Sequence, residues 1–269
     1  MMTFTDETLD IAGRNLVVRR SGWASGPAVV LLHPLGLNRR AFDALREALD
    51  PSWSVISYDQ RGHGVRADDD EFELEHLVDD AVALCRSLAS PVHLVGHALG
   101  GVVATLAAER VERALSLTVL AVPLKSQPAF AQRAERIESG MGVSVRAESL
   151  ARWLEGLEAE PNYQFVAAYG RTSLESTSER GYANGWRALA AFGELDLASA
   201  GVPTLCIAAV DDASVPLASV VPLLASEAQA SGRLRVEVLQ KGGHMLPLME
   251  PSLAAKLMES HWKQTQGST

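Results

Sequence analysis

Three short segments of the 269-residue chain carry groups whose types and order suit acyl transfer. The first is GHALG, residues 96–100, which has the glycine spacing of a nucleophile elbow, G-x-S-x-G. The second is VDDASVP, residues 210–216, and the third is KGGH, residues 241–244. Acyl transfer of this kind needs a nucleophile, an imidazole that takes its proton and a carboxylate that orients the imidazole. The segments provide all three positions, but the elbow carries Ala98 where a hydroxyl would attack.

Backbone amides near the elbow are candidates for binding an oxyanion. The residue after the nucleophile position, Leu99, begins a predicted helix, and an amide at a helix N-terminus can stabilise developing negative charge. The loop HPLGLN, residues 33–38, follows an apolar run and can provide a second amide. We therefore predict an oxyanion hole formed by the N–H groups of Leu35 and Leu99.

The acid and base positions follow two further predicted strands. Asp211 and Asp212 both come directly after the apolar run at 202–210, and either carboxylate could orient an imidazole. His244 follows the β-like run at 233–240, and the glycines before it leave the loop free to project its ring. From these residues alone, the choice between Asp211 and Asp212 stays open.

The elements around these segments predict an α/β fold. Strands are predicted at 28–33, 53–59, 91–97, 115–123, 202–210 and 233–240, and helices at 37–50, 72–88, 99–110, 217–230 and 251–264, after a hairpin within 3–22. This alternation is typical of a mostly parallel, doubly wound sheet covered by helices on both faces. From 124 to 200 the pattern is helical only. We expect residues 1–123 and 201–269 to form the core and residues 124–200 a helical cap.

Composition excludes several classes of function. Apolar residues make up 47% of the chain, and the net charge of −9 argues against a nucleic-acid partner. No segment has the length and apolar character of a membrane span or a secretory signal, so a cytoplasmic location and no membrane association are expected. Cys85 and Cys206 are expected to be buried free thiols. No cluster has metal-ligand spacing, so neither a metal nor a cofactor is expected, and the sequence carries no signal of an oligomeric state.

The chain resembles the α/β-hydrolase fold superfamily over nearly its whole length, through HPLG, YDQRGHG, VGHALGG and KGGH. Within it, these motifs are most similar to the branch of 3-oxoadipate enol-lactonases, haloperoxidase-like esterases and homoserine lactonases. The resemblance implies that Asp212 is the acid, because the family acid lies four residues before a proline, here Pro216. It further implies His244 as the base, Leu35 and Leu99 as the oxyanion donors, and a small-molecule ester or lactone as the substrate.

Alanine at the nucleophile position is the departure from this family. Ala98 has no lone pair with which to attack and no proton to transfer, so the chain cannot form an acyl-enzyme there. The most economical hypothesis is a carboxylic ester or lactone hydrolase inactivated by a Ser→Ala replacement at position 98. The alternatives are a natural non-catalytic binder of a small ligand, and chemistry by His244 and Asp212 without a nucleophile, such as proton abstraction or cofactor-free oxygenation. Hydrolysis of a C–C bond would use the same groups.

Two residues are candidates for substrate binding. Arg39 follows the predicted oxyanion loop and could bind a substrate carboxylate. Trp153, in the predicted cap, could face the site. The spacing of the motifs does not determine whether either side chain reaches the site, so both contacts are expectations.

Overall fold

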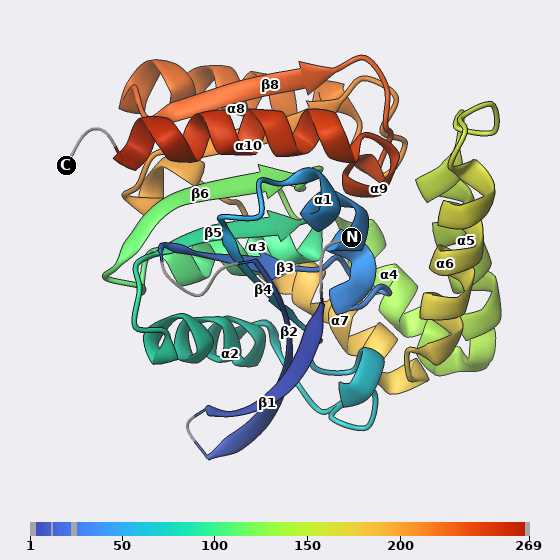
Figure 1. Cartoon of the computed structure of the whole chain (residues 1–269). Coiled ribbons are helices and arrows are strands. Elements are labelled where there is room, and N and C mark those ends of the chain that lie inside the picture. Colours follow the sequence, from blue (N-terminus) through green and yellow to red (C-terminus); the bar gives the residue numbers. More distant parts are fainter. Residues whose placement is uncertain (1–3, 12, 23–25, 267–269) are drawn as a thin grey trace.

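A computed structural model of the chain describes residues 4–11, 13–22 and 26–266. Residues 1–3 and 267–269, which the predicted core includes, lie outside the described residues, as do residue 12 of the predicted hairpin and residues 23–25. The chain folds around one eight-stranded sheet (Figure 1). Its strands are β1 (Thr5–Ile11), β2 (Arg14–Ser21), β3 (Ala28–Leu32), β4 (Ser54–Tyr58), β5 (Val92–His97), β6 (Ala114–Leu120), β7 (Thr204–Ala209) and β8 (Leu234–Leu239).

The strand order is β1-β2-β4-β3-β5-β6-β7-β8. The β1–β2 and β2–β4 pairs are antiparallel, and every other pair from β4 to β8 is parallel. The chain winds from β3 outward to β4 and then returns to the other side of β3 with β5. The order of strands therefore reverses between β3 and β5, and open α/β sheets bind ligands beyond the carboxyl ends of the strands at such a switch point. The loop after β3 and the elbow after β5 both lie there.

Helices cover both faces of this sheet (Figure 1). Helix α10 lies on one face with the short α1, and α2, α3 and α8 lie on the other. Their bounds are α1 (Asp43–Ala48), α2 (Leu74–Ser87), α3 (Leu99–Ala108), α8 (Leu217–Ser231), α9 (Leu246–Met249) and α10 (Pro251–Gln266). Three short 3₁₀ segments, η1 (Arg39–Phe42), η2 (Gly64–Arg66) and η4 (Leu197–Ala200), interrupt the loops.

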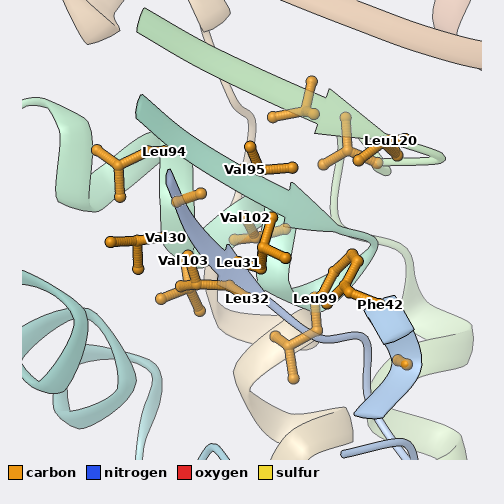
Figure 2. Packing of buried hydrophobic residues seen from close by; sticks show 14 of the residues in the cluster. Val30, Leu31, Leu32, Phe42, Leu94, Val95, Leu99, Val102, Val103 and Leu120 are labelled. Atoms are coloured by element: carbon orange, nitrogen blue, oxygen red, sulfur yellow. The ribbon is translucent and has the colours of Figure 1, made fainter. Parts of the chain in front are cut away.

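The central strands are buried on both faces, as their continuous apolar sequences predict. Every residue of β3, β4 and β5 is buried. Figure 2 shows Val30 to Leu32 of β3 and Leu94 and Val95 of β5 packing with Val102 and Val103 of α3. This packing holds α3 close to the sheet, directly beside the elbow from which the helix begins.

A helical segment between β6 and β7 stands at one end of the sheet (Figure 1). It contains α4 (Pro128–Arg136), the π-helical η3 (Ile137–Met141), α5 (Gly142–Leu154), α6 (Tyr163–Ser176) and α7 (Glu179–Ala191). The two ends of the segment pair with each other, because the Leu195 amide donates to the Leu124 carbonyl at 2.8 Å and the Ser126 amide to the Gly193 carbonyl at 2.6 Å. We refer to residues 124–200 as the cap from here on.

The α/β fold with a mostly parallel sheet, predicted from the sequence, is confirmed. All six predicted core strands form, with ends that differ by a few residues. The predicted helix at 37–50 is shorter and begins as the 3₁₀ segment η1, since the Asn38 side chain accepts the Arg40 amide and caps this turn. Cys85 and Cys206 are buried and form no disulfide. In the described ranges, no helix combines the length and the apolar character needed to cross a bilayer.

The close approach of α3 to β3 predicts a strict requirement for glycine at position 100. A Cβ atom there would lie 2.1 Å from the Leu32 carbonyl oxygen, a backbone atom that cannot move aside. Gly100→Ala is therefore expected to lower the free energy of unfolding by about 3 kcal/mol or more in urea titrations. Gly170→Ala is the matched control, because the one close contact of its Cβ would be the flexible end of the Leu150 side chain, with the Trp153 ring at an ordinary contact distance of 3.8 Å. That control should change stability by about 1 kcal/mol or less, and equal effects of the two substitutions would contradict this account.

Candidate active site

Ala98 occupies the sharp turn between β5 and α3. Its backbone angles are φ 48° and ψ −114°, a region that non-glycine residues rarely adopt and that typically costs about 1–3 kcal/mol. The turn closes because Gly96 and Gly100 touch, so that a Cβ on Gly96 would lie 2.1 Å from the Gly100 carbonyl oxygen. The Ala98 amide donates to the Leu120 carbonyl of β6 at 3.0 Å. The chain thus keeps the strained geometry of a nucleophile elbow with a methyl group at its tip.

The His244 ring is held by Asp212. Nδ1 of His244 lies 3.0 Å from Oδ2 of Asp212, and both side chains are almost completely buried. The other Asp212 oxygen accepts two backbone amides, those of Ser214 and Val215, each at 2.8 Å. Burial raises the pKa of the Asp212 carboxyl, but the imidazole and the two amides outweigh it and hold the pKa below its usual value. An ionised Asp212 fixes Nδ1 as the donor and leaves Nε2 of the ring as a base.

Asp211 has a different partner. Its Oδ1 atom accepts the Gly243 amide at 2.8 Å, which ties the loop after β7 to the loop after β8. Asp211 therefore contacts the backbone of the loop after β8, whereas Asp212 contacts the His244 ring. The structure brings Asp212, as the resemblance implies, onto the ring of His244, and places Asp211 against the backbone that carries this ring.

Two buried histidines brace the loop after β3. The ring of His33 contacts the Pro34 carbonyl through Nδ1 at 2.8 Å and accepts the Gln60 amide at Nε2 at 2.9 Å. His63 accepts the Gly36 amide at Nε2, also at 2.9 Å. Burial lowers the pKa of both rings, and each must be neutral at Nε2 to accept an amide. The loop that carries Leu35 is thus held on both sides by neutral imidazoles.

The amides of Leu35 and Leu99 remain without a protein acceptor in the ranges that the structure describes. Their neighbours are paired: the Gly36 amide donates to His63, and the Gly101 amide donates to the Ala98 carbonyl at 2.9 Å. Leu35 and Leu99 both line the cavity that contains Ala98. Amides free to donate beside the nucleophile position are what an oxyanion hole requires, and their role as its donors stays a prediction.

A narrow cavity of about 50 Å³ lies between the elbow and the cap. Ala98 and His244 line it from the sheet side, and Phe130, Trp153 and Trp186 line it from the cap. The Trp153 ring stacks near the His244 ring, with centroids 6.5 Å apart and planes inclined by 26°. Trp153 thus lines the cavity beside His244, and its role in binding substrate stays a prediction.

Arg39 is not among the residues that line this cavity. Its guanidinium pairs with Asp59, which is fully buried, and with Asp6 at 2.8 Å. The Asp59 carboxylate also accepts the Arg39 and Val65 amides, so this arginine serves to join the segments around β4. The expectation that Arg39 contacts substrate finds no support in its position, because two carboxylates already neutralise its charge.

Three polar cavity residues were not predicted from the sequence: Arg133 of α4, Arg152 of α5 and Ser214 of the loop after β7. The Ser214 hydroxyl is buried and has no hydrogen-bond partner among the described protein atoms. No local signal singles out the two arginines, because an amphipathic helix does not reveal which of its sides will face another domain. Ser214 lies within the Asp212–Pro216 segment, which offered a positional signal that was not used.

Among the described residues, no three His, Cys, Asp or Glu side chains are grouped closely enough to hold a metal ion. The polar groups at the cavity are instead one imidazole, two guanidiniums and one hydroxyl. With the neighbouring amides, these groups can accept a proton, donate hydrogen bonds to an oxyanion and bind an anion. Position 98 itself carries only a methyl group, which cannot act as a nucleophile.

The chain belongs to the alpha/beta hydrolase family, which matches residues 29–256. It is 30% identical over 205 residues to 3-oxoadipate enol-lactonase 1 of Acinetobacter baylyi, covering 74% of this chain and 77% of that one. It is also 27% identical over 254 residues to (E)-2-((N-methylformamido)methylene)succinate hydrolase of the same organism, covering 89% of this chain and 91% of that one. These two relatives are hydrolases.

A solved structure has the same fold. The enol-lactonase of Burkholderia xenovorans superimposes with a TM-score of 0.81 at 22% identity, over 96% of this chain and all of that one. The similarity extends through the cap as well as the sheet, since nearly the whole of each chain is covered. At this level of identity the comparison establishes the fold, and the chemistry must be argued from the residues of the site.

The buried histidines predict a loss of stability in mild acid. Burial lowers the pKa of His93 and that of His97 to about 3, from an ordinary value of 6.5. Below pH 6.5 the unfolded chain gains protons that the folded chain does not bind, so stability is complete above this pH and falls as the pH decreases towards 3. Between pH 6.5 and 5 each ring should contribute a loss of about 2 kcal/mol, measured by urea denaturation at the two pH values.

A variant isolates one of these rings. Nε2 of His97 contacts the His244 carbonyl at 2.7 Å, and a glutamine amide can also donate to that oxygen. His97→Gln should therefore reduce the pH-dependent loss by about 2 kcal/mol. An unfolding free energy that is the same at pH 6.5 and pH 5 would show that these histidines are not buried in neutral form.

Proposed function

We propose that the site is that of a carboxylic ester or lactone hydrolase acting on a small molecule, whose nucleophile has been removed by a Ser→Ala replacement at position 98. The observation that supports this most directly is the pairing of His244 Nδ1 with Asp212 Oδ2 at 3.0 Å, on the cavity that also contains Ala98. A buried, ionised carboxylate orients the imidazole and stabilises its protonated form. This matters for a reaction in which the imidazole takes or gives a proton.

In the proposed mechanism a hydroxyl at position 98 attacks the carbonyl carbon of the ester or lactone, and His244 takes its proton at Nε2. The carbonyl oxygen becomes an oxyanion that accepts hydrogen bonds from the Leu35 and Leu99 amides. His244 then gives its proton to the leaving oxygen, which produces an acyl-enzyme and an alcohol. Water attacks this ester by the same route and releases the acid. Asp212 holds the imidazole in one tautomer throughout.

The relatives support this substrate class. One is named for hydrolysis of an enol-lactone and another for hydrolysis of a substituted methylenesuccinate. Both names denote hydrolysis of a small molecule. The narrow cavity under Trp153 and Trp186 suits a small substrate as well.

A second candidate function is base catalysis by His244 and Asp212 without a covalent nucleophile. It is favoured by one feature of the chain as it stands: the imidazole is oriented and faces a cavity, although no hydroxyl lies at position 98. A positioned imidazole is enough to abstract a proton from a carbon acid or from water. Binding of a small ligand without any reaction is the remaining alternative.

Restoring the hydroxyl tests the proposal. Ala98→Ser should hydrolyse p-nitrophenyl acetate and small lactones with kcat/KM on the order of 10³-fold or more above that of the unchanged chain. The reason is that position 98 would regain the group that forms the acyl-enzyme. Steady-state assays over a panel of esters and lactones provide the measurement, and an Ala98→Ser protein that hydrolyses none of the panel would contradict the proposal.

The adjacent aspartates provide a matched pair of controls in the Ala98→Ser background. Asp212→Asn should reduce kcat by about 10³–10⁴-fold, because it imposes the wrong imidazole tautomer. Asp211→Asn keeps an oxygen that can accept the Gly243 amide and should leave kcat within a few-fold. If the two substitutions have the opposite effects, Asp211 is the carboxylate that supports the base.

The unchanged chain tests base catalysis by itself. Turnover of an activated ester by the Ala98 protein that is lost in His244→Gln would support reaction without a nucleophile. Background rates that are equal in the two proteins exclude this second candidate, and they leave the proposal for the Ala98→Ser form intact.

A further inference from the structure

The cap contributes two positive charges to the cavity. Arg133 of α4 and Arg152 of α5 line it together with Ala98 and His244. Both side chains are half-buried. Among the described residues, no aspartate or glutamate side chain lines the cavity. The site of a protein with a net charge of −9 is therefore locally cationic.

Neither arginine has a carboxylate partner within the described part of the chain. Arg152 donates to the Ser149 hydroxyl at 3.1 Å, and Arg133 takes part in no ion pair. Glu148, whose charge acts on both arginines, is itself paired with Arg136 at 2.6 Å. Arg39 and Arg61 of this protein, whose side chains are 12% and 8% exposed, are each paired with a carboxylate. Arg133 and Arg152 line one cavity without a carboxylate partner among the described residues, so an anionic ligand could neutralise their charge.

Aromatic rings hold Arg133 in place. Its guanidinium carbon lies 4.7 Å from the centre of the Trp186 ring and 5.9 Å from that of Phe130. A stacked guanidinium keeps its N–H donors in its own plane, directed away from the ring faces, where they can bind the two oxygens of a carboxylate. Trp186 and Phe130 thus orient these donors and leave them free.

The electrostatics favour an anion between the two side chains. Burial and the neighbouring charge of Arg152 lower the pKa of Arg133, and burial lowers that of Arg152. Both groups nevertheless stay protonated at neutral pH, since guanidinium loses its proton only under strongly alkaline conditions. A carboxylate between them would relieve their mutual repulsion and replace the hydration lost on burial.

We propose that Arg133 and Arg152 form a subsite for a carboxylate carried by the substrate. This inference rests on the proposed function and narrows it: the substrate has an ester or lactone carbonyl at one end and a free carboxylate at the other. The carbonyl lies at Ala98 between the Leu35 and Leu99 amides, and the carboxylate lies against the cap. Half-esters of dicarboxylic acids and lactones that bear a carboxylate side chain have this form.

The Ala98 protein permits a binding test, because it cannot form an acyl-enzyme with the probe at position 98. The probes are the monomethyl esters of succinate, glutarate and adipate, with the corresponding dimethyl esters as neutral counterparts, titrated by calorimetry at pH 7.5. At least one monomethyl ester should bind ten-fold or more tightly than its dimethyl ester. Arg133→Gln and Arg152→Gln should each remove at least ten-fold of the affinity for the monomethyl ester and leave that for the dimethyl ester unchanged.

Arg171→Gln is the matched control, since Arg171 is an exposed arginine of α6 that does not line this cavity. It should change neither affinity. Equal binding of the monomethyl and dimethyl esters, or an equal effect of Arg171→Gln, would overturn the subsite. If Ala98→Ser hydrolyses neutral esters while the binding preference is absent, the subsite fails and the proposed function stands. If the preference is present without hydrolysis by Ala98→Ser, the proposed reaction fails and the anion site stands.

Discussion

The position of the site depends on how closely α3 approaches β5 and β3. Gly96 and Gly100 allow the backbones to touch, and no side chain larger than hydrogen fits between them. This contact forces Ala98 into its left-handed conformation, directs its side chain to the carboxyl edge of the sheet and aligns the first amides of α3 beside it. Relaxing this backbone conformation would increase the stability of the fold by about 1–3 kcal/mol. The proposed Ser→Ala replacement at position 98 would account for this geometry under a methyl group.

The loops around the elbow are positioned by groups held in fixed charge states. His33 and His63 are neutral and accept amides on either side of the loop that carries Leu35. Asp212 is ionised and holds the base, while Asp211 ties the two loops after β7 and β8 together. Arg133 and Arg152 add positive charge. Among the residues described, they are the only charged side chains that line the cavity from the cap. Burial keeps His33 and His63 neutral, and its partners keep Asp212 ionised, so these parts of the site are oriented before any ligand binds.

The sequence predicted the sheet, its helices and the residues at the elbow, because these depend on local patterns: apolar runs, glycine spacing and the order of loops after strands. The residues alone left Asp211 and Asp212 open, and it was the resemblance to the α/β-hydrolase superfamily that implied Asp212 as the partner of His244. Arg39 was the arginine expected at the site, and Arg133 and Arg152 were not predicted. Arg39 lies near the oxyanion loop in sequence but is taken up by Asp59 and Asp6, whereas Arg133 and Arg152 reach the cavity from helices far away in the chain. Which side of a cap helix faces the sheet depends on tertiary packing, and no local pattern records it.

Under the proposed function, the site lacks only the hydroxyl oxygen of a serine at position 98. The most direct measurement is the intact mass of Ala98→Ser after exposure to a fluorophosphonate, an electrophile that reacts with a serine activated by a neighbouring base. The account predicts one adduct per chain, located by peptide mapping at position 98. It also predicts none in the unchanged protein or in Ala98→Ser combined with His244→Ala. An Ala98→Ser protein that stays unmodified while correctly folded would contradict the account, because the imidazole would then not be within reach of the hydroxyl.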